Sequence, residues 1–178
     1  MIRTFRNITP TIGPNCFIAD TADVIGNVTI GEHSSVWFQT VIRGDVDKIT
    51  IGHHTNIQDL TMVHVTGGRA CTNIGNYVTI GHSAVIHGCT IGDRCLIGMN
   101  ATILDYAVIG EDSIIAAGAV VSPGMIVPPR SMVMGVPGKI KKTLSDEEVE
   151  QLNHFWQAYI ELKEDYTREA ELSCRSAS

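Results

Sequence analysis

Three histidines are spaced so that they could bind one metal ion. His64 and His87 each come directly after an aliphatic residue, and His82 lies five residues before His87. Neutral imidazole is a common ligand of zinc, at Zn–N distances of about 2.0–2.1 Å. The remaining histidines are assigned to turns or to the surface: His33, His53, His54 and His154. The spacing therefore predicts a metal site on His64, His82 and His87.

A six-residue period runs through the sequence and must position these histidines. Aliphatic residues recur in an unbroken register at Ile91, Ile97, Ile103, Ile109, Ile115, Val121, Val127 and Val133. A helix would show apolar spacings of three and four, and an amphipathic strand would alternate strictly. The period instead indicates short strands joined by regular turns, with three hexads in each coil and about 4.8 Å between coils. We expect the Gly and Asn residues to lie at the turns, where a positive φ costs them least.

Such coils would arrange the polar residues in columns. Arg43, His64 and His87 directly follow aliphatic residues that are one coil apart, so they should form one column along an edge of a prism. By the same count, Asp59 and His82 share a second column on an adjoining face. His82 of one chain would then meet His64 and His87 of a neighbouring copy. This arrangement predicts a closed homotrimer with three equivalent metal sites between subunits.

Composition and charge argue against several classes of protein. Acidic residues outnumber basic ones by 19 to 13, and the basic residues form no block suited to nucleic acid. No run approaches the roughly 18 apolar residues of a membrane span, and the N-terminus lacks an apolar stretch of signal-peptide length. The five cysteines include no Cys-x-x-Cys pair, which favours a reducing compartment. We expect a cytoplasmic protein that binds neither nucleic acid nor membrane, in which Cys89 and Cys95 pack as small apolar side chains.

The composition changes near residue 138. Ser145 and Glu148 have the spacing of a capping box, which predicts the start of a helix. That helix would carry an apolar stripe for packing along the β-helix or a neighbouring subunit, made of Val149, Leu152, Trp156, Tyr159 and Tyr166. We predict a β-helix of six-residue repeats over 1–143, a C-terminal helix over 144–172 that packs on it, and a disordered tail over 173–178.

Five segments occur in an order that is typical of one family. They are Arg43-Gly44-Asp45, Asn56-Ile57-Gln58-Asp59, Val63-His64-Val65, Ile80-Gly81-His82 and Ile86-His87-Gly88-Cys89-Thr90-Ile91-Gly92. These segments resemble the signatures of the γ-class carbonic anhydrases, which belong to the hexapeptide-repeat family. Together with the terminal helix, the resemblance spans nearly the whole chain. It implies an all-β fold, namely a left-handed parallel β-helix of triangular cross-section, followed by a C-terminal α-helix.

The resemblance implies a metal-dependent enzyme. It makes His64, His82 and His87 the ligands of a zinc ion, with His82 donated by the neighbouring subunit and with Fe²⁺ as the alternative metal. Zinc lowers the pKa of bound water from 15.7 to about 7. The implied reaction is the hydration of carbon dioxide to bicarbonate by a zinc-bound hydroxide at the subunit interface of the trimer.

The same resemblance assigns roles to polar residues near these ligands. Arg43 and Asp45 resemble an ion pair that joins subunits in the family. Gln58 and Asp59, with Asn56 behind them, resemble residues that orient the attacking hydroxide. A carboxamide can do this by accepting or donating a single well-placed hydrogen bond.

Two features complicate this assignment. Tyr159 resembles the family's active-site tyrosine, although its place in the apolar stripe explains it equally well. Well-known active members carry a Glu where this chain has Val46, and a further acidic residue in the insertion that here reads Thr66-Gly67-Gly68-Arg69-Ala70-Cys71-Thr72-Asn73. That insertion holds no carboxylate, so the family's proton relay is missing from both positions.

Other functions stay open at the level of sequence. The first alternative is a metal-binding trimer with little or no anhydrase activity, serving assembly or small-molecule binding. The second is a hexapeptide-repeat acyltransferase, or a thioesterase that uses the same metal, since one fold supports many activities.

Overall fold

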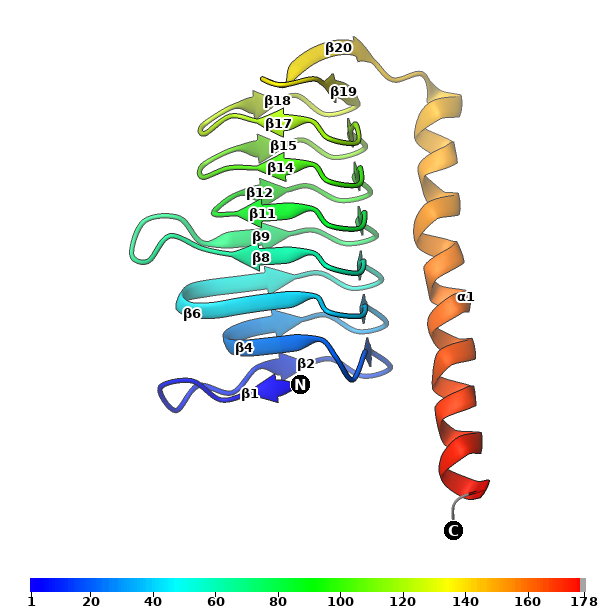
Figure 1. The fold of residues 1–178 in the computed structure, drawn as a ribbon. Coiled ribbons are helices and arrows are strands. Elements are labelled where there is room, and N and C mark those ends of the chain that lie inside the picture. The colour runs from blue at the N-terminus through cyan, green and yellow to red at the C-terminus, as the bar shows by residue number, and fades with distance from the viewer. Residues whose placement is uncertain (177–178) are drawn as a thin grey trace.

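The chain folds into a parallel β-helix with one long helix lying beside it (Figure 1). The computed structural model describes residues 1–176, apart from the side chains of residues 171 and 173–176. The helix, α1 (Asp146–Ser176), is described past the predicted end at residue 172. Residues 177–178 lie outside the described part of the chain, so the disordered tail over 173–178 stays a prediction.

Two faces of the prism form one bent, 12-stranded sheet. Its strands are β1 (Ile2–Arg3), β2 (Thr11–Ile12), β4 (Asp23–Ile30), β6 (Val41–Ile51), β8 (Met62–His64), β9 (Thr72–Ile74), β11 (Val85–His87), β12 (Thr90–Ile91), β14 (Thr102–Ile103), β15 (Val108–Ile109), β17 (Val120–Val121) and β18 (Ile126–Val127). The long strands β4 and β6 pass through the corner between the two faces, because β6 pairs with β8 by its first half and with β9 by its second half.

The third face is an 8-stranded sheet in the order β20-β19-β16-β13-β10-β7-β5-β3. Its strands are β3 (Phe17–Ile18), β5 (Ser35–Val36), β7 (Asn56–Ile57), β10 (Thr79–Ile80), β13 (Leu96–Ile97), β16 (Ile114–Ile115), β19 (Ser131–Met134) and β20 (Lys139–Thr143). All its pairings are parallel except the last, in which β20 turns back and runs antiparallel to β19. The last residue of β20 coincides with the predicted domain boundary at 143.

The aliphatic residues of the six-residue period fill the interior. Ile86 pairs with Val63 in the coil before it and with Ile103 in the coil after it. All three side chains are fully buried. Burying an aliphatic side chain of this size stabilises a fold by roughly 1.5–3 kcal/mol, and the contribution repeats on every face of every coil. The predicted fold class is thereby confirmed, including the left-handed β-helix type that the family resemblance implied.

The glycines of the repeat have a different role from the one expected. Those that follow the aliphatic residues do not have a positive φ: Gly13, Gly31, Gly52, Gly75, Gly81, Gly92, Gly98 and Gly110. Their Cα atoms face the backbone of the next coil, and a Cβ built on Gly92 would lie 2.7 Å from the backbone N of Glu111. The expectation that these glycines supply positive φ is therefore wrong, and close approach of backbone explains them.

Positive φ occurs at the corners and is carried mostly by other residues. Asn15 and Asn100 have φ values of 56° and 57°, as the sequence predicted for asparagine, but His33, Leu60 and Tyr77 adopt the same conformation. Most of these corner residues are held by a backbone hydrogen bond to the preceding coil, such as Tyr77 N to His53 O at 3.0 Å. The stacked coils therefore impose this conformation on residues that do not favour it by themselves.

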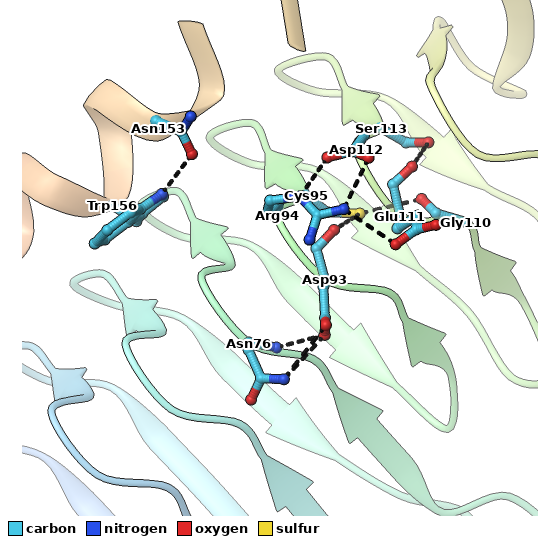
Figure 2. Close-up of polar contacts among 10 residues, drawn as sticks. All are labelled: Asn76, Asp93, Arg94, Cys95, Gly110, Glu111, Asp112, Ser113, Asn153 and Trp156. Atoms are coloured by element: carbon cyan, nitrogen blue, oxygen red, sulfur yellow. Dashed lines mark hydrogen bonds and ion pairs between the residues drawn. The ribbon is translucent and has the colours of Figure 1, made fainter. Parts of the chain in front are cut away.

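Polar side chains link successive coils along the corner that faces the helix (Figure 2). Asp93 accepts hydrogen bonds from the backbone N and the Nδ2 of Asn76, at 2.8 and 3.3 Å. One coil further on, Arg94 donates to Asp112 through Nε at 2.6 Å and to Glu111 through Nη2 at 3.1 Å. These contacts pair residues that are 17 or 18 positions apart, and so they fix the register between coils from the outside.

Helix α1 begins with the predicted capping box. Glu148 N donates to Ser145 Oγ at 3.3 Å, and Ser145 N donates to Glu148 Oε2 at 3.1 Å. The helix then runs back alongside the coils towards the N-terminal end of the stack (Figure 1). Trp156 packs on Tyr77 with ring centroids 4.8 Å apart, and Tyr166 packs on Phe17 at 5.7 Å. The predicted apolar stripe thus covers the β-helix of its own chain.

Membrane insertion through a helix has no support in residues 1–176. None of the helical structure described there combines the length and the apolar character that a membrane span needs.

The two uses of glycine can be separated by a pair of substitutions. Gly92→Ala should destabilise the protein by roughly 1–3 kcal/mol, because the new Cβ would overlap the next coil. Gly118→Asn should cost at most about 1 kcal/mol, because Gly118 has a φ of 67° with open space around it and Asn tolerates that conformation. Urea-denaturation midpoints of the two variants and the parent protein would test this. Equal losses in both variants would contradict it.

Candidate metal centre

His64 and His87 lie side by side at one corner of the prism. They end β8 and β11 and are direct register partners in this parallel strand pair. His64 Nδ1 and His87 Nε2 are 3.2 Å apart. Their side chains are 16% and 30% exposed, so both rings are accessible from outside the coil. The predicted column of these two histidines is therefore present.

A carboxylate holds the other ring nitrogen of each histidine. His64 Nε2 lies 3.0 Å from Asp45 Oδ1, and His87 Nδ1 lies 2.5 Å from Asp105 Oδ1. These contacts leave His64 Nδ1 and His87 Nε2 as the two nitrogens that face one another. A carboxylate behind each imidazole fixes the tautomer and the orientation of the ring, an arrangement common around protein-bound metals.

Both carboxylates are held in their charged form. Burial would raise the pKa of Asp45, but hydrogen bonds from His64 and from Arg43 outweigh that effect and hold the pKa below its usual value. The Thr66 hydroxyl donates to Asp105 Oδ2 at 2.7 Å. That bond, together with the bond from His87 and against the effect of burial, lowers the pKa of Asp105.

The backbone around the two histidines is braced by the insertion between β8 and β9. Thr72 Oγ1 donates to the carbonyl of His64 at 2.6 Å and accepts from Gly88 N at 3.0 Å. One hydroxyl therefore ties together the two coils that carry the histidines. In the preceding coil, Arg43 continues the column, and its Nη1 pairs with Asp45 of the same chain. The expected pairing of these two residues across a subunit interface stays a prediction.

His82 lies at a different corner. It follows β10, and its Nδ1 lies 2.8 Å from Asp59 Oδ2. Asp59 Oδ1 also accepts from the backbone N of Phe38 at 3.2 Å, so the carboxylate is itself held in place. The side chain of His82 is 39% exposed. Asp59 and His82 thus form the second column, separated from the first by one face of the prism.

A single chain does not assemble the complete predicted ligand set. Within the described residues, no group of three His, Cys, Asp or Glu side chains is arranged to hold a metal ion. The structure brings His64 and His87 together and leaves His82 apart with its Nδ1 bonded to Asp59. The ligand roles of all three stay predictions that depend on a second copy of the chain.

Gln58 is fixed by a chain of side-chain hydrogen bonds on the same edge as His82. Its Nε2 donates to Asn56 Oδ1 at 3.1 Å, and Asn56 Nδ2 donates to Thr79 Oγ1 at 2.9 Å. Both amide residues are buried. Among the described contacts, none uses Gln58 Oε1. The amide oxygen is therefore the atom of Gln58 that is available to a ligand.

Tyr159 lies in the aromatic cluster under the helix. Its ring meets Trp37 edge-on with centroids 5.2 Å apart. Burial, and then the charge of Asp59, raise the pKa of the Tyr159 hydroxyl above its ordinary value. The side chain therefore belongs to the apolar stripe and also lies within electrostatic reach of the Asp59–His82 pair, and its catalytic role stays a prediction.

Asp105 is the residue of this site that sequence reasoning missed. It lies 18 residues after His87, in the next coil, and it follows the repeat residue Ile103 by two positions. The hexad count places Leu104 opposite His87, because Ile86 pairs with Ile103, so counting alone would not have singled out Asp105. At the positions where the family resemblance implies carboxylates, Val46 and residues 66–73 provide none.

Comparisons of this chain with a family model and with curated proteins agree on one family. The chain matches the family model described as bacterial transferase hexapeptide (six repeats), over residues 9–44, 71–105 and 88–123. It is 54% identical over 153 residues to a Methanocaldococcus jannaschii protein named probable carbonic anhydrase, which covers 86% of this chain and 96% of that protein. It is 41% identical over 175 residues to gamma carbonic anhydrase 2, mitochondrial, of Arabidopsis thaliana, a match that covers 94% of this chain and 63% of the plant protein.

A solved structure agrees with the fold. A Bacillus cereus protein described as a putative acetyltransferase superposes with a TM-score of 0.90 at 38% identity, covering 93% of this chain and 96% of that one. The relatives of this chain are thus named after two kinds of enzyme, carbonic anhydrase and acetyltransferase.

Cys89 and Cys95 should be chemically inert. Burial raises the pKa of Cys89 and of Cys95 to about 12, as expected for thiols packed in the core. Cys71, in contrast, is exposed on the insertion. Iodoacetamide at pH 8 should therefore alkylate Cys71 in the native protein and leave Cys89 and Cys95 unmodified, as read by peptide mass spectrometry. Full protection of Cys71 or rapid labelling of Cys89 would contradict this.

Proposed function

Because the chain belongs to the hexapeptide-repeat family, within its γ-class carbonic anhydrases, we propose that it hydrates carbon dioxide to bicarbonate at a metal centre shared between subunits of a homotrimer. The observation that carries the proposal is the pair His64 and His87, whose facing nitrogens are 3.2 Å apart and whose other nitrogens are each bonded to a carboxylate.

The donor set fits a metal ion. Two nitrogens that each lie about 2.0–2.1 Å from one tetrahedral zinc ion are roughly 3.3 Å from each other. The observed separation of 3.2 Å matches this, although none of the side chains described in this chain completes the set as a third ligand. Two neutral imidazoles with carboxylates behind them are typical zinc donors, and imidazole also suits Fe²⁺. Zinc is the metal that we propose, with Fe²⁺ as the alternative.

His82 of a neighbouring subunit is the proposed third ligand. Its Nδ1 is engaged by Asp59, which leaves Nε2 with a free lone pair on the outside of the prism. A threefold arrangement would place the His82 corner of one chain against the His64 and His87 corner of the next, giving three equal sites. Three imidazoles leave one position of a tetrahedral zinc open for water, whose pKa the ion lowers to about 7.

The neighbouring polar residues would orient the reactants. Gln58 can present its Oε1 as a hydrogen-bond acceptor, since its amide is anchored by the bond from Nε2 to Asn56 and no described contact uses the oxygen. A fixed acceptor selects one orientation for a hydroxyl group that approaches it. Arg43 forms an ion pair with Asp45, and the Asp45 carboxylate in turn orients the His64 ring. Arg43 and Asp45 would therefore act through His64 rather than on substrate.

The proposed setting is the cytoplasm. The cysteines whose side chains are described are free thiols, namely Cys16, Cys71, Cys89 and Cys95. Free thiols are usual in a reducing compartment, which supports this setting.

The first test combines metal content with activity. Protein loaded with zinc, and separately with Fe²⁺ under anaerobic conditions, should bind about one ion per chain and accelerate carbon dioxide hydration, followed by stopped-flow pH indicator. His82→Ala should lose both the stoichiometric metal and the activity, since one ligand in three is removed. His154→Ala, which changes an exposed histidine of α1, is the matched control and should behave as the parent protein.

The same measurements separate the alternatives. The parent protein could bind one metal ion per chain and yet hydrate carbon dioxide no faster than His82→Ala does. That outcome would support the alternative of a metal-binding trimer with little turnover. Full activity in His82→Ala, or a protein that carries no metal when purified and reloaded, would refute the proposed centre. Acyl transfer in metal-free protein would favour the acyltransferase chemistry named for the structural relative.

Asp105 gives a second test of the same centre. Asp105→Asn keeps the size of the side chain but weakens the bond to His87 Nδ1, so the affinity for zinc should fall by about 10- to 100-fold. Competition with a chelating dye would measure this. Asp20→Asn, a change at an exposed carboxylate away from the site, should leave the affinity unaltered. An unchanged affinity in Asp105→Asn would show that Asp105 does not position a metal ligand.

A further inference from the structure

A polar pocket of about 480 Å³ lies between α1 and the first coils of the β-helix. It is lined from the β-helix by Asn15 and His33, and from the helix by Lys163, Thr167 and Arg168. These residues belong to the corner that faces α1. The candidate metal centre lies at another corner, so the pocket is a separate feature of the molecule.

Lys163 is the unusual member of this lining. As a residue it is only 4% exposed, but its ammonium group, for which no partner is found among the described side chains and backbone groups, keeps contact with solvent in the pocket. Lysine is rarely buried to this extent unless it is paired. Its apolar stem is buried while the charged end faces the pocket, so the charge is available to an anion that enters there.

Among the described side chains that line the pocket, none supplies an anion paired with Lys163. Glu164 is the one acidic residue in the described lining, and it forms no ion pair with Lys163. Cys16 also lines the pocket, but its thiol donates to the carbonyl of Gly31 at 3.1 Å. Burial raises the pKa of that thiol, so Cys16 is not a thiolate at neutral pH.

The rest of the lining adds hydrogen-bond donors around the ammonium group. Thr167 carries a hydroxyl, which in this structure donates to the carbonyl of Lys163 at 2.8 Å. Asn15 carries an amide, at 3.5 Å from His33 Nε2. Arg168 reaches the rim, where its Nη2 donates to Asp165 at 2.6 Å. A compact group with several acceptor oxygens and a negative charge would complement these donors.

We infer that this pocket is a binding site for a small oxyanion, of the chemistry shared by phosphate, sulfate and bicarbonate, with Lys163 as its charged anchor. The ligand would bridge Lys163 and Thr167 of α1 to Asn15 and His33 of the first coils. Its binding would therefore strengthen the attachment of the helix to the β-helix, and the protein would become more stable as the anion concentration rises.

Isothermal titration of the full-length, zinc-loaded protein with inorganic phosphate at constant ionic strength tests the site. The parent protein should bind phosphate, and its melting temperature should rise as phosphate is added. Lys163→Met keeps the apolar stem but removes the charge, so it should weaken binding by about tenfold or more and abolish the rise in melting temperature. Lys139→Met, on the exposed strand β20, is the matched control and should bind as the parent does.

Further variants keep the result decisive. Lys163→Arg retains the charge and should retain binding, and Thr167→Val should weaken it at an exposed position that tolerates substitution. His82→Ala should still bind phosphate, because that change affects the proposed metal centre alone. Displacement of phosphate by sulfate or by bicarbonate in the same titration would rank the three anions. Phosphate affinity that is equal in the parent, Lys163→Met and Thr167→Val, or absent in all three, would overturn the inference.

Discussion

The structure depends on direct stacking of each coil on the one before it. Gly92 N donates to Ile109 O at 2.8 Å, and Ile91 pairs with Ile109 in the parallel ladder. Such pairing leaves no room for a side chain where backbone approaches backbone, as Gly92 shows, and it repeats the same corner at intervals of one coil. A residue on the outside therefore has a fixed neighbour above and below it. The contacts of His64 with His87 and of Arg94 with Asp112 have this one origin.

Stacking also determines where the chain can accept insertions. Extra residues can leave the prism only at corners, because a longer face would break the ladder. The insertion between β8 and β9 leaves at the corner of His64, and Thr72 then returns to bind the backbone of both histidine coils. The departure from the regular period is thus part of the support of the candidate metal centre.

The repeat predicted the coils and their columns, because a β-helix converts sequence distance directly into spatial distance. The capped helix was predicted separately from the spacing of Ser145 and Glu148, and the left-handed form came from the family resemblance. The pair His64 and His87 followed from counting hexads, and so did the separation of His82. Asp105 was missed, because the same count places Leu104 opposite His87 and Asp105 one residue further along. The role of the repeat glycines was misjudged, because composition does not distinguish a positive φ from a close approach. The burial of Lys163 could not be predicted from the sequence, because it depends on how α1 packs against the β-helix. The six-residue repeat does not encode that packing.

The last strand of a parallel ladder leaves backbone N–H and C=O groups without partners. At one end of the molecule, the antiparallel strand β20 pairs with such a strand. It covers β19 and presents an exposed strand that carries Lys139, Lys141 and Lys142. Charged lysines on an edge strand oppose the addition of another strand, because stacking two such ends would bring like charges together. The cap thereby guards against end-to-end fibre growth, to which a repetitive fold with open ends is otherwise prone.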